Sequence, residues 1–223
     1  MNRRGELSAG RAVILFDFDG TLADSFPALL RVAAKLAVEE NKPVLTAEDI
    51  QAFRRLHASD LIRRSGLPKT KIPFWLSRIR REMALETPDM GSFPGMKEAL
   101  AQLREDGAAL AIVTSNGEEN VRQFLGNHQW ETWFDLVETG SPLFGKARLI
   151  RRAARRLGGA DPDRVWYVGD ELRDIEAARA AGVRAAAVTW GFNDADILAA
   201  AKPDLLLARP ADLPTLGIDG RTG

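Results

Sequence analysis

The chain has 223 residues, of which 45% are hydrophobic and 28% charged, and its 31 basic residues balance its 31 acidic ones. This length allows one large domain with an insert, and the zero net charge argues against a nucleic acid as partner. The lack of cysteine excludes disulfides and thiolate chemistry, and no apolar segment is long enough to cross a membrane, so we expect a cytoplasmic protein.

A short apolar segment, Ala12 to Phe16, is the first predicted element and is typical of a strand buried on both faces. Two carboxylates, Asp17 and Asp19, follow it. Residues two apart in an extended chain project to the same side, and Gly20 allows a sharp turn after them. The repulsion between the carboxylates would be relieved by a cation or by protonation of one of them. Taken alone, an Asp-Gly pair is also common turn chemistry.

The next stretch, residues 26–87, has a helical pattern with no strand alternation, which indicates a helical insert after the first strand. Thr46 suits a helix start because acidic residues follow it in the first turn. The helices that we expect in this insert are Pro27–Glu40, Ala47–Leu56, Ser59–Arg64 and Pro73–Glu86.

From Phe93 onward, helices and strands alternate, which predicts a parallel, doubly wound α/β sheet. Asn116 is expected to be the N-cap of one helix, with Glu119 as its capping-box partner. The tail after Leu216 predicts no element. The expected strands are Ala108–Val113, Phe134–Glu138, Arg164–Val168, Val183–Val188 and Leu205–Leu207. The other expected helices are Pro94–Glu105, Lys146–Leu157, Arg173–Ala181 and Asp194–Ala201.

Two further polar groups stand between these predicted strands and helices. Thr114 and Ser115 follow a strand and precede a helix N-terminus, where side-chain and backbone donors could bind a phosphoryl oxygen. Such residues are otherwise simply helix caps. Lys146 begins a helix, although the helix dipole favours cations at the other end, so its ordinary interpretation is a solvated side chain.

An acidic cluster after the strand at Arg164–Val168 is the last polar group. Asp174 lies four residues beyond Asp170, so both return to one side if a helical turn starts there. The alternative is that Asp170 or Glu171 caps a helix and that Asp174 lies on the surface.

In this order, the groups resemble the four signatures of the haloacid dehalogenase superfamily in its phosphoglycolate phosphatase-like form, from Ala12 to Leu207. The most specific segments are Asp17–Thr21 and Gly169–Asp174. The segment Val188–Phe192 is also similar to the stretch after the fifth strand in those relatives. The resemblance implies a Rossmann-like core domain (residues 1–23 and 92–223) and a helical cap domain (residues 24–91).

The resemblance also implies a phosphatase that uses Mg²⁺ and acts on a small phosphorylated metabolite, phosphoglycolate-like or a sugar phosphate. Asp17 would be the nucleophile and Asp19 the general acid and base. Mg²⁺ would be held by the carboxylates of Asp17 and Asp170 and by the main-chain carbonyl of Asp19. The phosphoryl oxygens would be bound by Thr114, Lys146 and amides near Gly20 and Ser115. Behind these would lie Glu171 and Asp174, the latter orienting Lys146 or metal-bound water.

Substrate choice is expected in the insert, because Phe53–Ser59 corresponds to a substrate-contacting cap loop in the relatives. Arg54 and His57 are the candidates for an acidic substrate, or are surface residues; the glycine usual at the position of Arg55 is absent. Asp19 favours phosphoryl transfer over dehalogenation. A sugar-phosphate mutase and a non-catalytic phospho-ligand-binding regulatory protein remain the alternatives. A monomer or a homodimer is expected.

Overall fold

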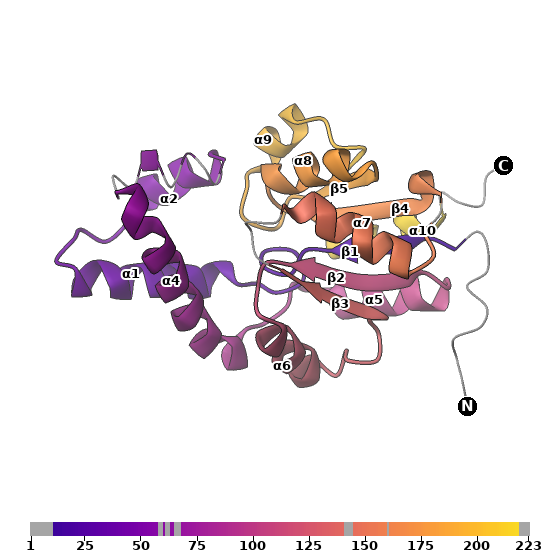
Figure 1. The fold of residues 1–223 in the computed structure, drawn as a ribbon, viewed down its shortest axis with the longest axis horizontal. Coiled ribbons are helices and arrows are strands. Elements are labelled where there is room, and N and C mark those ends of the chain that lie inside the picture. Colours follow the sequence, from indigo (N-terminus) through magenta and orange to yellow (C-terminus); the bar gives the residue numbers. More distant parts are fainter. Residues whose placement is uncertain are drawn as a thin grey trace.

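One parallel sheet lies at the centre of the structure, with the strand order β3-β2-β1-β4-β5-β6 (Figure 1). All neighbouring strands are parallel, so the predicted doubly wound α/β fold is confirmed. The strands are β1 (Val13–Phe16), β2 (Ala109–Thr114), β3 (Leu136–Thr139), β4 (Val165–Gly169), β5 (Arg184–Val188) and β6 (Leu205–Leu207). The structure is a computed structural model that describes residues 11–57, 60, 63–64, 68–140, 145–159 and 161–218.

Alternate residues of β1 face two different layers of helices. Ile14 and Phe16 pack in the cluster formed with α5, α6 and α10, whereas Val13 and Leu15 pack in the cluster formed with α7, α8 and α9. Because both faces are covered, the strand is apolar throughout. These helices are α5 (Met96–Glu105), α6 (Glu118–His128), α7 (Lys146–Arg156), α8 (Leu172–Ala181), α9 (Ala195–Ala200) and α10 (Thr215–Ile218).

The register of the central strands brings their carboxyl ends to one edge of the sheet. Phe16, the last residue of β1, lies opposite Ile112 of β2 and Val168 of β4. β2 and β4 continue slightly beyond that level, to Thr114 and Gly169. The loops that follow the three strands therefore emerge side by side, which is where ligands bind in open α/β sheets.

The helical insert, whose elements extend from Phe26 to Asp89, is set apart from the sheet, and its helices α1, α2 and α4 lie at the left of Figure 1. α1 packs against α4, and Thr46, the predicted helix start, caps α2 and forms a capping box with Asp49. The expected helix Ser59–Arg64 lies largely outside the described residues. The elements of the insert are α1 (Phe26–Glu39), α2 (Ala47–Arg54), α4 (Ile72–Glu86) and the 3₁₀ turns Lys69–Lys71 and Thr87–Asp89.

Three sequence-based expectations about helix ends are wrong. Gly117, not Asn116, is the N-cap of α6, because the Asn116 side chain accepts from Gly117 N and donates to Asp19. α5 begins at Met96, not Pro94, because Gly95 adopts a left-handed conformation with φ of 82°. The tail forms the short helix α10, since burial of Leu216 in the core outweighs its weak helical pattern.

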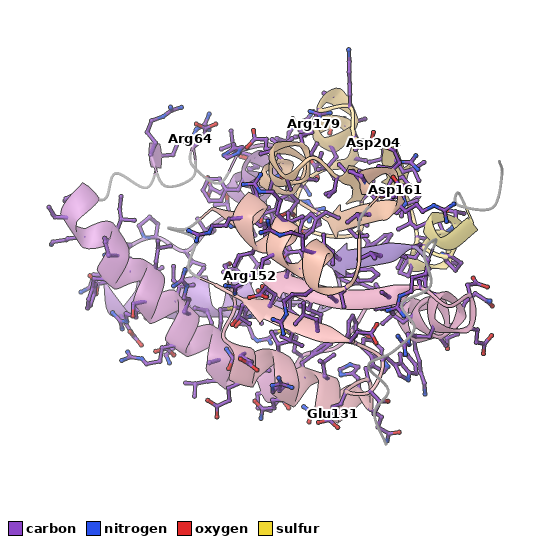
Figure 2. The ribbon with its side chains drawn as sticks, turned by 45° about the vertical axis from the view of Figure 1, so that its right-hand side comes forward. Arg64, Glu131, Arg152, Asp161, Arg179 and Asp204 are labelled. Carbon is purple, nitrogen blue, oxygen red and sulfur yellow. The ribbon has the colours of Figure 1, made fainter. Side chains whose placement is uncertain are left out.

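Charged side chains, three of them labelled in Figure 2, join neighbouring elements of the core: α7 to β3, α8 to the end of α9, and the loop before β6 to β5. Arg152 on α7 binds the buried Glu138 of the edge strand β3. Arg179 donates to the carbonyl of Ala201 at 2.6 Å, and Asp204 accepts from Ala185 N at 2.7 Å. Two further 3₁₀ turns, Pro162–Arg164 and Pro210–Asp212, complete the elements. None of the helices in the described ranges is both long and apolar enough to cross a bilayer.

Candidate active site

The polar residues predicted at the strand ends meet in one buried cluster. Asp17 follows β1, Asp170 follows β4, and Asp174 lies in the first turn of α8; their exposed fractions are 3%, 1% and 2%. Lys146 Nζ lies 2.5 Å from Asp17 Oδ2 and 2.6 Å from Asp174 Oδ1. The structure thus brings together side chains that are more than a hundred residues apart in the chain.

Lys146 lies at the start of α7, where the helix dipole disfavours a cation. The two carboxylates offset that cost, and the ammonium also lies over the ring of Tyr167, 5.4 Å from its centre. Burial alone would lower the pKa of Lys146, but Asp17 and Asp174 raise it well above its usual value. Lys146 therefore stays charged and partly neutralises the acidic cluster.

Asp17, Asp170 and Asp174 could together hold a metal ion, because each offers a carboxylate oxygen and these oxygens lie within 4.8 Å of one another. Hard carboxylate oxygens suit Mg²⁺. Burial raises the pKa of Asp17, and that of Asp170 is raised well above its usual value by burial and by Glu171 and Asp174. A cation would relieve this electrostatic cost, so the residues present fit a divalent metal.

Neighbouring groups hold the Asp170 carboxylate in a fixed orientation. Thr21 Oγ1 donates to Asp170 Oδ1 at 2.8 Å, and Phe192 N donates to Oδ2 at 2.7 Å. Gly20 has φ of 73°, and a Cβ there would lie 2.2 Å from Asp170 Oδ2. Only glycine therefore fits at the turn after Asp19.

Asp19 is placed differently from the three clustered carboxylates. Its Oδ2 accepts from Asn116 Nδ2 at 3.0 Å, while its Oδ1 is buried without a hydrogen-bond partner in the described part of the chain. Burial and the charge of Asp17 raise the pKa of Asp19, with the Asn116 bond acting against them. A raised pKa favours the protonated form, which suits a proton donor.

Thr114, Ser115 and Asn116 form the loop that follows β2. Thr114 Oγ1 accepts from Asn116 N at 3.0 Å, and this is its one hydrogen bond among the described residues, so its hydroxyl hydrogen can still be donated to a ligand. Asn116 orients Asp19, a role that sequence reasoning missed by assigning Asn116 to a helix cap. The only available signal was an amide side chain directly after the two hydroxyl residues.

A cavity of 210 Å³ opens above this cluster, between the strand-end loops and the helical insert. Its walls on the core side are polar, and those on the insert side are mostly apolar. Glu171 and Ser115, both predicted, line it, and so do Arg80 and Arg173, which were not predicted. The residues that line the cavity are Asp19, Gly20, Ser25, Phe26, Leu29, Ile79, Arg80, Met83, Ser115, Asn116, Asp170, Glu171, Arg173 and Phe192.

Arg54 and His57, the predicted substrate contacts, lie outside the cavity lining and bind the core domain instead. Arg54 donates to Asp194 Oδ1 at 2.8 Å and to the carbonyl of Gly191 at 3.1 Å. His57 Nε2 lies 3.1 Å from Glu176 Oε2. A direct role in substrate binding stays a prediction for both residues.

Asn193, which sequence reasoning also missed, joins the insert to the start of α8. Its buried side chain donates to the carbonyls of Arg54 and Leu56, at 2.9 and 3.2 Å, and accepts from Leu172 N at 2.9 Å. Together with the two bonds of Arg54, these contacts form a polar latch. We use "latch" below for the contacts of Arg54 and Asn193.

Comparisons with known proteins agree with this geometry. The family described as haloacid dehalogenase-like hydrolase matches residues 14–188. A phosphoglycolate phosphatase of Synechococcus elongatus is 40% identical over 200 residues, which cover 90% of this chain and 94% of that protein. One of Pectobacterium atrosepticum is 31% identical over 95% of this chain and 94% of its own.

Solved structures show the same fold. A haloacid dehalogenase-like family hydrolase from Streptococcus pneumoniae has a TM-score of 0.79 at 24% identity, covering 92% of this chain and 98% of that one. A predicted phosphatase from Clostridium acetobutylicum has a TM-score of 0.78 at 19% identity, covering 95% of this chain and 100% of that one.

Proposed function

The chain belongs to the haloacid dehalogenase-like hydrolases, and from this premise we propose that it is a Mg²⁺-dependent phosphatase acting on phosphoglycolate or a similar small phosphorylated metabolite. The observation that carries the proposal is the cluster of Asp17, Asp170 and Asp174, with Lys146 paired to Asp17 and Asp174 and with Asp170 in the wall of a cavity of metabolite size. The names of the relatives support phosphoglycolate in particular.

In this proposal Asp17 attacks the phosphorus atom and the alcohol leaves, which gives an aspartyl-phosphate. Asp19 donates its proton to the departing oxygen. Water then attacks the phosphorus of the intermediate and gives its proton to Asp19, so that inorganic phosphate is released and both carboxylates return to their starting states. The unpartnered, buried Oδ1 of Asp19 in the cavity wall supports this assignment.

The phosphoryl oxygens would be bound by Lys146, by the Thr114 hydroxyl and by backbone amides near Gly20 and Ser115. Asp17 and Asp170, with the main-chain carbonyl of Asp19, would hold Mg²⁺, and Asp174 is close enough to be a further ligand. When bound, Mg²⁺ supplies positive charge against the carboxylates and the phosphoryl group.

The helical insert would be a cap domain formed by residues 24–91, and the core domain would consist of residues 1–23 and 92–223. Its supporting evidence is the position of Phe26, Leu29, Ile79 and Met83, which form the apolar side of the cavity. Walls of this kind exclude water from the site and leave room for a small leaving group.

Hydrolysis of 2-phosphoglycolate with and without Mg²⁺ tests the proposal. We expect turnover that disappears in excess chelator and returns with Mg²⁺, and a Mg²⁺-dependent rise in the melting temperature. Asp170→Asn should abolish both effects, whereas the exposed Asp163→Asn should keep them. Full activity in chelator would contradict the metal assignment, and binding of phosphate esters without turnover would indicate a non-catalytic protein.

A further inference from the structure

We propose that Arg80, on α4 of the helical insert, binds an anionic group on the leaving-group side of the substrate, and so selects phosphate esters that carry a carboxylate. The inference rests on the proposed phosphatase function and names the residue and the substrate chemistry behind its specificity.

Arg80 faces the cavity together with its neighbours on one side of α4. Ile79, Arg80 and Met83 all line it, and the last two are three residues apart, which places them on adjacent turns of one helix face. Figure 1 shows α4 crossing α1, whose Phe26 and Leu29 form the adjoining wall. Among these insert residues the only charge is that of Arg80.

The nearby arginines of α4 differ from Arg80 in having partners. Arg78 binds Glu39 and Glu40 and lies over the ring of Trp75. Arg81 lies 3.9 Å from Glu82. Within the described ranges, Arg80 has no hydrogen bond, ion pair or ring contact, so its guanidinium is available to a ligand.

The other guanidinium in the cavity wall is already neutralised. Arg173 lies 2.5 Å from Glu171 Oε1, and the remaining charged groups of the core wall, Asp19 and Asp170, are acidic. An anionic leaving group therefore finds no unpaired cation among the charged side chains of the core wall. Among the described residues of the insert wall, Arg80 is the single cation, and guanidinium matches a carboxylate with two parallel hydrogen bonds.

The orientation of the substrate follows from the difference between the core wall and the insert wall of the cavity. The phosphoryl group must reach Asp17, whose carboxylate lies within 4.8 Å of that of the lining residue Asp170, so the rest of the ester extends toward the insert. The apolar side chains there suit a short leaving group with few hydroxyls, and Arg80 suits one that ends in a carboxylate. Glycolate has both properties.

The contact between Arg80 and a carboxylate can be tested by comparing two esters of nearly equal size. These are 2-phosphoglycolate and 2-hydroxyethyl phosphate, in which a CH₂OH group replaces the carboxylate. For the wild type we expect a higher kcat/KM on 2-phosphoglycolate. Arg80→Gln should lower that value by about 10- to 100-fold, the usual effect of losing a hydrogen bond between charged groups, while sparing 2-hydroxyethyl phosphate. The loss should fall mainly on KM, and Arg80→Lys should restore part of it.

Arg81→Gln is the matched control, because Arg81 is the next residue of the same helix and lies outside the cavity lining. It should leave both esters unaffected. The inference is overturned if Arg80→Gln keeps the wild-type preference, if Arg81→Gln loses it equally, or if the wild type hydrolyses both esters equally well. In the last case the phosphatase function stands; a wild type that hydrolyses neither ester overturns that function, and this inference with it.

Discussion

The strand-end cluster and the helical insert face the same cavity, but they are built in opposite ways. Asp17, Asp170 and Asp174 are buried and held by bonds between distant parts of the chain. In the insert, α2 and α4 contain no buried residue, and the ion pairs of α4 to α1 lie at the surface. The core thus fixes the positions of the reacting groups, whereas substitutions on α2 and α4 should cost less stability than substitutions in the cluster.

This contrast has an electrostatic side. Burial raises the pKa values of Asp17, Asp19 and Asp170, so the folded protein holds these carboxylates in a setting that opposes their ionised form. Binding of a cation and a phosphoryl group would relieve this unfavourable setting, and that relief favours their binding. Arg80 faces no such constraint, because it is exposed and needs only to be free of partners.

The largest expected effect lies in the core. Asp19→Asn removes the proton donor but keeps Asp17, so turnover of 2-phosphoglycolate should fall by about 10²- to 10⁴-fold, the usual range for general acid–base catalysis. With para-nitrophenyl phosphate, whose leaving group needs no proton, a rapid burst of para-nitrophenol should precede slow turnover. Stopped-flow absorbance measures the burst. Asp24→Asn, a neighbouring acid outside the cavity lining, serves as the control, and absence of the burst in Asp19→Asn would count against the assigned role.

The second prediction compares how much the strand-end cluster and the helical insert contribute to the free energy of unfolding. Lys146→Met leaves two buried carboxylates without their ammonium, and breaking a buried pair in this way costs about 3–5 kcal/mol of the free energy of unfolding. Lys35→Met breaks the exposed pair with Glu82 in the insert and should have no measurable effect. Urea denaturation of the metal-free proteins measures both. Similar losses in the two variants would contradict the difference between the regions.

A smaller effect is expected at the latch. Arg54→Ala should weaken the contact between insert and core, and a loss of about 1 kcal/mol there lowers the ratio of latched to unlatched protein roughly fivefold. Because the latch holds the insert in place for every substrate, kcat/KM should fall equally for 2-phosphoglycolate and para-nitrophenyl phosphate. Arg55→Ala, which breaks an exposed pair with Asp196, is the control. A loss confined to 2-phosphoglycolate would instead support the substrate contact predicted for Arg54 from the sequence.

The sequence predicted those parts of the site that follow from strand ends. The end of an apolar run marks the end of a strand, and parallel strands end at the same edge of the sheet. Asp17, Thr114 and Asp170 could therefore be expected to meet. Lys146 was predicted only through the resemblance, since its place at a helix start argues against a special role.

The parts that escaped prediction depend on which face a helix or loop turns inward. Helical periodicity on α4 cannot distinguish Arg80 from Arg78 or Arg81, because all of α4 is at least partly exposed and its orientation is set by packing against α1. Asn193 lies in a loop without periodicity, and its bonds to Arg54 and Leu56 exist only once the insert folds back.

The covalent intermediate on Asp17 is the central claim, and labelled acetyl phosphate tests it most directly. Acetate leaves without a proton, so Asp19→Asn should form the phosphoenzyme and hydrolyse it slowly. The account predicts that Asp19→Asn accumulates label that hydroxylamine releases, as from an acyl phosphate, and that Asp17→Asn acquires none. Label on Asp17→Asn would show that another residue is the nucleophile and would contradict the account.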